Sequence, residues 1–246
     1  MMDKDIAVLI IGLGSMGKRR ARNLKALGFS NVYGFDLRED RRKEAEQKNS
    51  INTFSSFEEA CKVTNPKALI ISVPPDVHHI YMRHAVEMEI PFFVEASVVD
   101  TGIAEISAAC KTKNILAAPS STMYFHPAIQ KIFSLVRSGY LGNITNVIYH
   151  SGQFLPDWHT YEKVSDFYVS NKETGGAREI VPFEMTWLCS LFGFPEAVAG
   201  MVKKTIEIGG ADEIDDTYNL LFDYRSFTLR SEEHTSELQS HSFISY

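Results

Sequence analysis

An apolar run that leads directly into a glycine-rich turn most constrains what this chain can fold into. Ile6–Ile11 contains no polar side chain, as in a parallel strand buried on both faces. The turn that follows reads GLGSMG, and Ser15–Leu27 then places apolar residues on one helical face before Gly28 ends the helix. The segment therefore predicts a strand, a tight turn and a helix.

The glycine turn has the spacing G-x-G-x-x-G, a weak signal that becomes strong between a buried strand and a helix. Gly12 would permit the tight turn, Gly14 would let the backbone approach a pyrophosphate, and Gly17 would let the helix pack closely on the sheet. The helix N-terminus, with Ser15 and Met16 in its first turn, would then bind the phosphates. A plain glycine turn is the alternative.

An acidic residue is expected about 20 residues after such a turn, at the end of the second strand. Asp36 lies there, directly after Asn31–Phe35. Its carboxylate would accept hydrogen bonds from ribose hydroxyls and would repel a 2′-phosphate, which favours NAD over NADP. Arg38, two residues further on, leaves NADP open.

Strands and helices then alternate as far as about Ser121. Beyond the second strand, we expect a charged helix after Arg38, a strand at Ile51–Phe54, a helix from Ser56, a strand at Lys67–Val73, a helix from Asp76 to Met88, a strand at Pro91–Glu95, a helix at Thr101–Lys113 and a strand at Ile115–Pro119. This alternation predicts right-handed crossovers and a doubly wound parallel sheet, that is, an α/β Rossmann domain over residues 1–121.

The pattern changes in residues 122–229. We expect a helix at Pro127–Ser138, a strand at Ile144–Phe154, a polar loop rich in aromatics, a helix at Ala177–Phe192, and strands near Ala197–Ile208 and Thr217–Tyr224. Such an order predicts an α+β domain with an open, mainly antiparallel sheet.

The last residues, Arg230–Tyr246, are polar and aperiodic and match a translated nucleic-acid sequence. A common DNA sequencing adapter, read in one frame, encodes RSEEHTSELQSH, the sequence of residues 230–241, and Ile244–Tyr246 continue that adapter after a short index. We interpret residues 230–246 as a non-native, adapter-derived tail and expect it to pack on nothing. The native sequence would then stop near Leu229, which leaves the second domain incomplete.

Composition excludes several classes of partner. The net charge of −6, without a long lysine or arginine run, argues against nucleic acid. No apolar stretch reaches the ~20 residues of a membrane span, and the N-terminus has no signal-peptide pattern, so we expect a cytoplasmic protein. The three cysteines form no C-x-x-C pair, which indicates reduced thiols and no metal site. The expected partner is a small molecule.

The chain resembles the Gfo/Idh/MocA family of sugar oxidoreductases over essentially all of residues 5–229. Four segments carry the resemblance: GLGSMGKRRARNLKALG, ISVPPDVHH, FFVEAS and SSTMYFHPAIQKIFSLVRSGYLGNI. The resemblance implies NAD(P)-dependent chemistry on sugars, cyclitols or nucleotide sugars, and a homo-oligomer formed through the second-domain sheet. It also implies that Val73, Pro74 and Pro75 line the nicotinamide side of the cofactor. His78 would match the histidine after the paired prolines, or it would simply sit in the first turn of a helix.

The sequence departs from the family pattern at the catalytic positions. Where the family usually has Glu-Lys-Pro, this chain has Glu95-Ala96-Ser97. The glutamate is present, and we assign Glu95 to the cofactor site, but the lysine is absent. The family's Asp-x-x-x-His pair falls on Glu179 and Phe183, so the histidine is absent too. Oxidation of an alcohol needs a group that takes the hydroxyl proton, and neither position supplies the usual one.

Other residues could take that role. Glu179 is the first candidate for the base, provided burial raises its pKa, and His159 is the second. For the substrate, Trp158 could stack on a sugar face, and His159, with Tyr161 beside it, could instead hydrogen-bond to the sugar. Lys172 and Arg178 could bind a carboxylate or phosphate. The alternative for each is a packing or surface role.

Three functions therefore remain open. The leading one is an NAD-dependent oxidoreductase of a sugar or nucleotide sugar, in surface-polysaccharide biosynthesis by family analogy. The second is a lyase, hydrolase or epimerase in which tightly held NAD is transiently reduced and regenerated. The third is a non-catalytic NAD-binding or regulatory protein, which the missing lysine and histidine make tenable.

Overall fold

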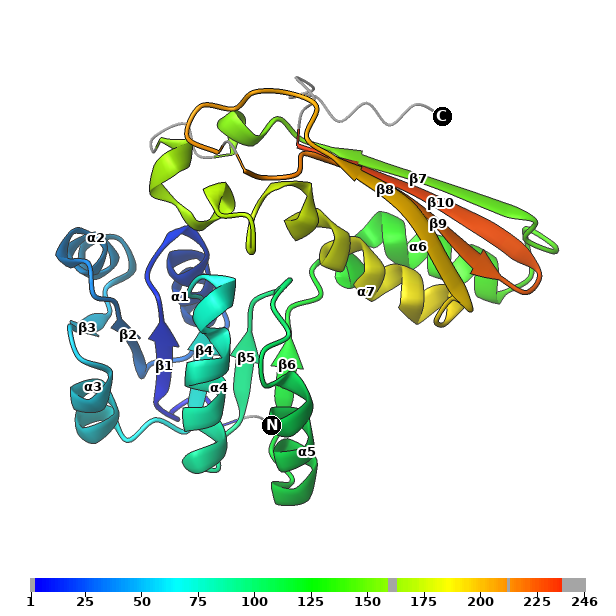
Figure 1. The fold of residues 1–246 in the computed structure, drawn as a ribbon. Helices are drawn as coiled ribbons and strands as arrows, with labels where there is room; N and C mark the ends of the chain where they lie inside the picture. The colour runs from blue at the N-terminus through cyan, green and yellow to red at the C-terminus, as the bar shows by residue number, and fades with distance from the viewer. Residues whose placement is uncertain (1–2, 159–162, 212, 236–246) are drawn as a thin grey trace. The chain divides into compact units, whose positions relative to one another are not determined.

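The computed structural model describes residues 3–158, 163–211 and 213–235, and the chain divides into two compact units, Met1–Ser120 and Ser121–Tyr246 (Figure 1). Each unit has its own sheet and its own hydrophobic core. No helix in the described part of the chain is long and apolar enough to cross a membrane.

Unit 1 is built on a six-stranded, all-parallel sheet of order β3-β2-β1-β4-β5-β6 (Figure 1). Its strands are β1 Val8–Ile11, β2 Val32–Phe35, β3 Asn52–Phe54, β4 Ala68–Ile71, β5 Phe92–Val94 and β6 Ala117–Pro119. Its helices are α1 Ser15–Ala26, α2 Glu39–Asn49, α3 Phe57–Thr64, α4 His78–Glu87 and α5 Ile103–Lys113, with a 3-10 turn η1 at Pro75–Val77. The predicted doubly wound sheet is confirmed.

Burial on both faces explains why β1 is continuously apolar. Leu9 and Ile11 belong to a core cluster that includes residues of α3, α4 and α5, whereas Val8 and Ile10 belong to a second cluster with residues of α1 and α2. Successive side chains of a strand point to opposite faces, so every position of β1 is interior. The chain reverses its winding between β1 and β4, which lie side by side, and ligands of such sheets bind at the carboxyl ends of the strands at this point.

Unit 2 has a four-stranded sheet of order β7-β10-β9-β8 (Figure 1). The strands are β7 Asn146–Gly152, β8 Ala197–Lys203, β9 Thr217–Tyr224 and β10 Phe227–His234; the helices are α6 Pro127–Arg137 and α7 Ile180–Phe192. Short 3-10 turns are η2 Met123–Phe125, η3 Leu155–Asp157, η4 Val164–Asp166, η5 Tyr168–Ser170 and η6 Gly176–Glu179. Only the β7–β10 pair is parallel among these described strands, so the predicted mainly antiparallel sheet is confirmed.

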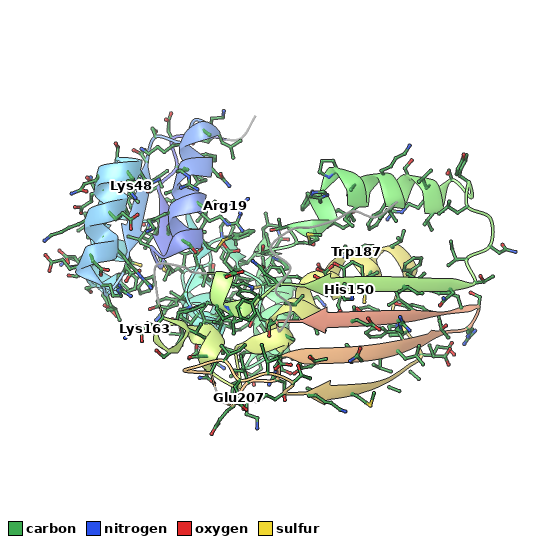
Figure 2. All side chains as sticks on the ribbon, turned by 90° about the horizontal axis from the view of Figure 1, so that it is seen from above. Arg19, Lys48, His150, Lys163, Trp187 and Glu207 are labelled. Atoms are coloured by element: carbon green, nitrogen blue, oxygen red, sulfur yellow. The ribbon has the colours of Figure 1, made fainter. Side chains whose placement is uncertain are left out.

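The core of unit 2 lies between this sheet and its two helices. Trp187 of α7 is buried and meets the Tyr149 ring of β7 edge-on at 5.6 Å (Figure 2). Leu229 of β10 and Phe222 of β9 join the same cluster. A second cluster, formed by the loops, includes Leu155 and Val169.

Two predicted elements differ from their expected limits by three residues or more. The strand expected to reach Ile208 ends at Lys203, because the Asp216 carboxylate accepts hydrogen bonds from the backbone N–H groups of Thr205 and Ile206, at 2.8 and 2.9 Å. The helix expected from Ala177 begins as the 3-10 turn η6 and becomes α-helical at Ile180.

The prediction that residues from Arg230 onward pack on nothing is wrong for the described part of that segment. Arg230–His234 extend β10, which pairs with β7 on one side and β9 on the other. The physical reason is that ladder hydrogen bonds come from the backbone, so an extended segment of almost any sequence can occupy the gap between two strands.

Candidate functional site

The glycine turn between β1 and α1 requires glycine at two positions. Gly12 has a φ of +86°, and a Cβ on it would lie 2.5 Å from the carbonyl oxygen of Ser72. A Cβ on Gly17 would lie 1.8 Å from the carbonyl oxygen of Gly12. Both approaches are far below van der Waals contact, so the turn brings α1 against β1 and the end of β4 as closely as backbones allow.

The same turn is open where a phosphate would approach. A Cβ on Gly14 would meet nothing nearer than the Arg41 guanidinium, at 3.7 Å. Gly14 is the N-cap of α1, no side chain caps this helix end, and its first turn holds no acidic residue. The backbone N–H groups of Ser15 and Met16 are in that first turn, where a helix leaves such groups without intrahelical partners. This cradle fits the pyrophosphate of a dinucleotide.

Asp36 lies at the carboxyl end of β2 and is held against the glycine turn. It is only 7% exposed, and its carboxylate accepts the N–H of Leu13 at 2.7 Å and the N–H of Arg38 at 2.8 Å. The Arg38 guanidinium contacts Asp40 at 2.6 Å. Arg41, which the sequence did not single out, places its Nη1 4.0 Å from the Asp36 carboxylate. Arg42 donates to the backbone carbonyl of Asp36 at 2.8 Å, so Arg41 and Arg42 both lie beside the expected ribose site.

The segment after β4 is held by a buried histidine. Val73 and Pro74 follow the strand, and Pro75 opens η1. His78 begins α4, and its Nε2 lies 2.8 Å from the carbonyl oxygen of Val73. Burial lowers the pKa of His78, so the ring is neutral at pH 7 and Nε2–H donates this hydrogen bond. His78 does not cap α4 through its side chain, and it fixes the Val73 backbone.

The Glu95 carboxylate, at the end of β5, is engaged on both oxygens. Arg20 of α1 donates to each oxygen at 2.7 Å, and the Ser72 hydroxyl donates to Oε1 at 3.2 Å. Ala96 follows and offers no ionisable group. In unit 1 the described site therefore combines a phosphate cradle, an anchored Asp36 and a fixed Glu95, with no evident proton acceptor beside Ala96.

In unit 2, a Thr-Gly-Gly segment delivers Glu179 to a buried position. A Cβ on Gly175 would lie 1.7 Å from the carbonyl oxygen of Val169. Gly176 has a φ of +67°, and its Cβ would lie 2.3 Å from the carbonyl oxygen of Asp215. Only glycines allow the chain to pass so close to both segments. Thr174, just before them, donates from its hydroxyl to the carbonyl of Tyr168 at 2.7 Å.

Glu179 itself is a buried carboxyl group with one specific partner. It is 9% exposed, and its Oε1 accepts the Tyr168 hydroxyl at 2.5 Å. Its Oε2 is buried and has no hydrogen-bond partner among the described residues. Burial raises the pKa of Glu179 to about 7, against the opposing effect of the Tyr168 hydrogen bond. Such a carboxylate exchanges a proton near neutral pH.

The other candidates of unit 2 are differently placed. Trp158 is half-buried against the loop core, and its indole N–H has no partner in the described chain. Lys172 is exposed, and Arg178 makes an ion pair with Glu173 at 3.5 Å. His159 and Tyr161 lie outside the described residues. No group of three or more His, Cys, Asp or Glu side chains that could hold a metal occurs in the part searched, the described residues.

Residues 6–116 match the family model described as "Oxidoreductase family, NAD-binding Rossmann fold" (GFO_IDH_MocA). Comparison with curated proteins found no match.

Several solved structures share the fold at low sequence identity. The WlbA dehydrogenase from Bordetella pertussis, in complex with NADH and UDP-GlcNAcA, is 16% identical with a TM-score of 0.83, over 97% of this chain and 69% of that one. The myo-inositol 2-dehydrogenase from Lactobacillus plantarum is 16% identical with a TM-score of 0.80, over 94% and 70%. An oxidoreductase from Agrobacterium radiobacter, in complex with NAD+, L-tartaric acid and magnesium, is 12% identical with a TM-score of 0.82, over 98% and 70%.

These matches agree with the geometry of unit 1, in which a glycine cradle and an anchored acidic residue lie at the point where a doubly wound sheet binds a dinucleotide. Over residues 6–116, its NAD-binding Rossmann domain, the chain is similar to the Gfo/Idh/MocA oxidoreductase family.

Proposed function

We propose that the protein is an NAD-dependent oxidoreductase that acts on a sugar, cyclitol or nucleotide sugar, with Glu179 as the proton acceptor. The observation that carries this proposal is the buried Glu179 carboxyl, whose pKa is raised to about 7 and whose Oε2 has no partner in the described chain. In a chain that has Ala96 and Phe183 at the family's usual catalytic positions, this group has the right acidity for a general base.

The cofactor site is proposed on the residues of unit 1. Gly12, Gly14 and Gly17, with the N–H groups of Ser15 and Met16, would hold the pyrophosphate. Asp36 would accept the ribose hydroxyls, with the Arg41 guanidinium near its carboxylate. Val73, Pro74 and Pro75, with His78 behind them, would line the nicotinamide half.

NAD, when bound, supplies the hydride acceptor. The carbon that loses the hydride becomes a carbonyl only if its hydroxyl also loses a proton, and Glu179 accepts that proton through Oε2. The Tyr168 hydroxyl donates to Oε1 and so holds the carboxylate in one orientation.

The substrate class is supported by similarity. A dehydrogenase whose structure contains UDP-GlcNAcA and an inositol dehydrogenase share this fold. We propose that the second domain, residues 122–229, holds a substrate of this kind, with Arg178 and Lys172 available to an anionic group and Trp158 to a sugar face. Surface-polysaccharide biosynthesis, a cytoplasmic location and a homo-oligomer through the second sheet remain proposals of the same kind.

The test is turnover of the full-length protein on a panel of sugars, cyclitols and nucleotide sugars with NAD. Glu179→Gln should lower kcat about 100- to 10,000-fold and leave NADH affinity within about twofold. Glu207→Gln, an exposed glutamate of the same unit outside the proposed site, is the control and should retain activity. Near-normal turnover of Glu179→Gln would place the base elsewhere, with His159 next in line.

Two other outcomes would replace the proposal. Cofactor that stays bound through purification, with product formed but no net NADH, would identify a lyase, hydrolase or epimerase. Cofactor binding without turnover on any member of the panel would identify a non-catalytic NAD-binding protein.

A further inference from the structure

A charged pair that the proposed chemistry does not use joins the glycine-turn helix to the end of β5. Arg20 Nε and Nη2 donate to the two oxygens of Glu95, each at 2.7 Å. The two side chains are 18% and 14% exposed, so this is a largely buried, bidentate ion pair. Lysine could not replace arginine in this geometry, because an ammonium group cannot donate two parallel hydrogen bonds in a rigid fork.

The pair has two further contacts that fix its place. The Arg20 guanidinium carbon lies 4.6 Å from the centre of the Phe93 ring, a cation–π contact. On the other side, the Ser72 hydroxyl donates to Glu95 Oε1 at 3.2 Å. The backbone carbonyl of Ser72 is the atom that closely faces Gly12. Glu95 therefore connects α1, β5 and the residue at which the segment Ser72–Pro75 leaves β4.

The sheet order decides which half of the cofactor this segment faces. In a doubly wound sheet, one mononucleotide half binds over β1 and β2 and the other over β4 and β5. Asp36 marks the adenosine half at β2, so the ends of β4 and β5 belong to the nicotinamide half. The segment Ser72–Pro75 and Glu95 lie at those two ends.

We propose that Arg20 and Glu95 are positioning residues that hold the segment Ser72–Pro75 in the conformation that receives the nicotinamide ring. Arg20 neutralises Glu95, and Glu95 then accepts from Ser72 without carrying an unpaired buried charge. Loss of Arg20 leaves that charge uncompensated and frees the start of the segment. This inference rests on the proposed cofactor site, but not on Glu179 or on any substrate.

The experiment compares two ligands that share every group except the nicotinamide. ADP-ribose and NADH are titrated by calorimetry into the full chain and into Arg20→Gln, Glu95→Gln and the double variant. Arg19→Gln, an exposed neighbour on the same helix, is the control (Figure 2). The double variant removes both charges, so it folds without an unpaired buried ion even if a single variant does not.

Arg20→Gln and the double variant should bind NADH about tenfold more weakly, with ADP-ribose affinity within about twofold of the parent. Arg19→Gln should change neither. If the variants lose affinity for both ligands equally, the pair has only a general structural role and the inference is overturned. Unchanged NADH affinity in these variants would also overturn it. If the parent binds neither ligand, the cofactor site itself fails, an outcome distinct from failure of the positioning role.

Discussion

Replacing Glu179 by glutamine should stabilise unit 2 at alkaline pH and not at acidic pH. The carboxyl is buried and its Oε2 has no partner in the described chain, so ionising it inside the fold is costly. Glutamine has nearly the same shape, cannot ionise, and can still accept the Tyr168 hydroxyl through its amide oxygen. The variant therefore removes the cost of ionisation while it keeps the hydrogen bond.

The magnitude follows from the shift of the pKa. Burial raises it from 4.5 to about 7, and each pKa unit corresponds to ~1.4 kcal/mol. The folded state thus holds the proton more tightly than the unfolded state. The stabilisation by the protonated group is complete below pH ~4.5 and is lost as pH rises through ~7, a change of about 3 kcal/mol. Glutamine does not ionise, so the variant does not lose this stability. Relative to the parent, the free energy of unfolding of Glu179→Gln should be about 3 kcal/mol higher at pH 8 than at pH 4.5.

Tryptophan fluorescence in urea measures this quantity selectively. Both tryptophans of the chain, Trp158 and Trp187, lie in unit 2, so the signal reports the unfolding of that unit. Unfolding curves at pH 5 and pH 8 are compared for the parent, for Glu179→Gln and for the exposed control Glu173→Gln, which should show no such pH dependence. A Glu179→Gln effect that is the same at both pH values, or destabilising at pH 8, would refute the reasoning.

Two further predictions concern the cofactor preference and the loop fold. The parent should bind NAD more tightly than NADP, and Asp36→Ala should narrow that gap in titrations of both cofactors; equal or tighter NADP binding by the parent would contradict the role of Asp36. Gly175→Ala should destabilise unit 2 by about 3 kcal/mol in the same urea assay, because its Cβ would meet the Val169 carbonyl at 1.7 Å. Gly209→Ala, with open space around its Cβ, should be neutral, and equal effects of both changes would reject the packing argument.

The cofactor half of the site follows from sequence because its signals are local. Gly12 and Gly17 are needed where a strand turns into a helix, and that context is visible in the periodicity on either side. The position of Arg41 is not visible in the sequence pattern, which points only to Arg38. Both lie close behind Asp36 in sequence, and only the direction in which the first turn of α2 leaves β2 puts Arg41 beside the carboxylate.

The proton-transfer half of the site depends on contacts that the hydrophobic periodicity of the sequence does not predict. The hydrogen bond between Tyr168 and Glu179 joins two 3-10 turns, and the chain between them is irregular. The pair Gly175-Gly176 permits a close backbone approach, but a sequence does not say which segments approach. Glu179 could be selected by alignment with a family position; its partner required the fold.

The inward face of β10 changes character at Leu229, and this change supports a foreign origin for the residues that follow. Leu229 is buried in the core, whereas the next inward positions are Ser231 and Glu233, also fully buried. Burial raises the pKa of Glu233 to about 7, and its Oε2 has no partner among the described residues. A buried strand face selects apolar side chains, so a native sequence here would continue the pattern of Leu229. We therefore predict that DNA amplified from the source across codons 229 and 230 encodes a different sequence after Leu229, with apolar residues at positions 231 and 233. Source DNA that encodes Ser231 and Glu233 would show that the tail is native.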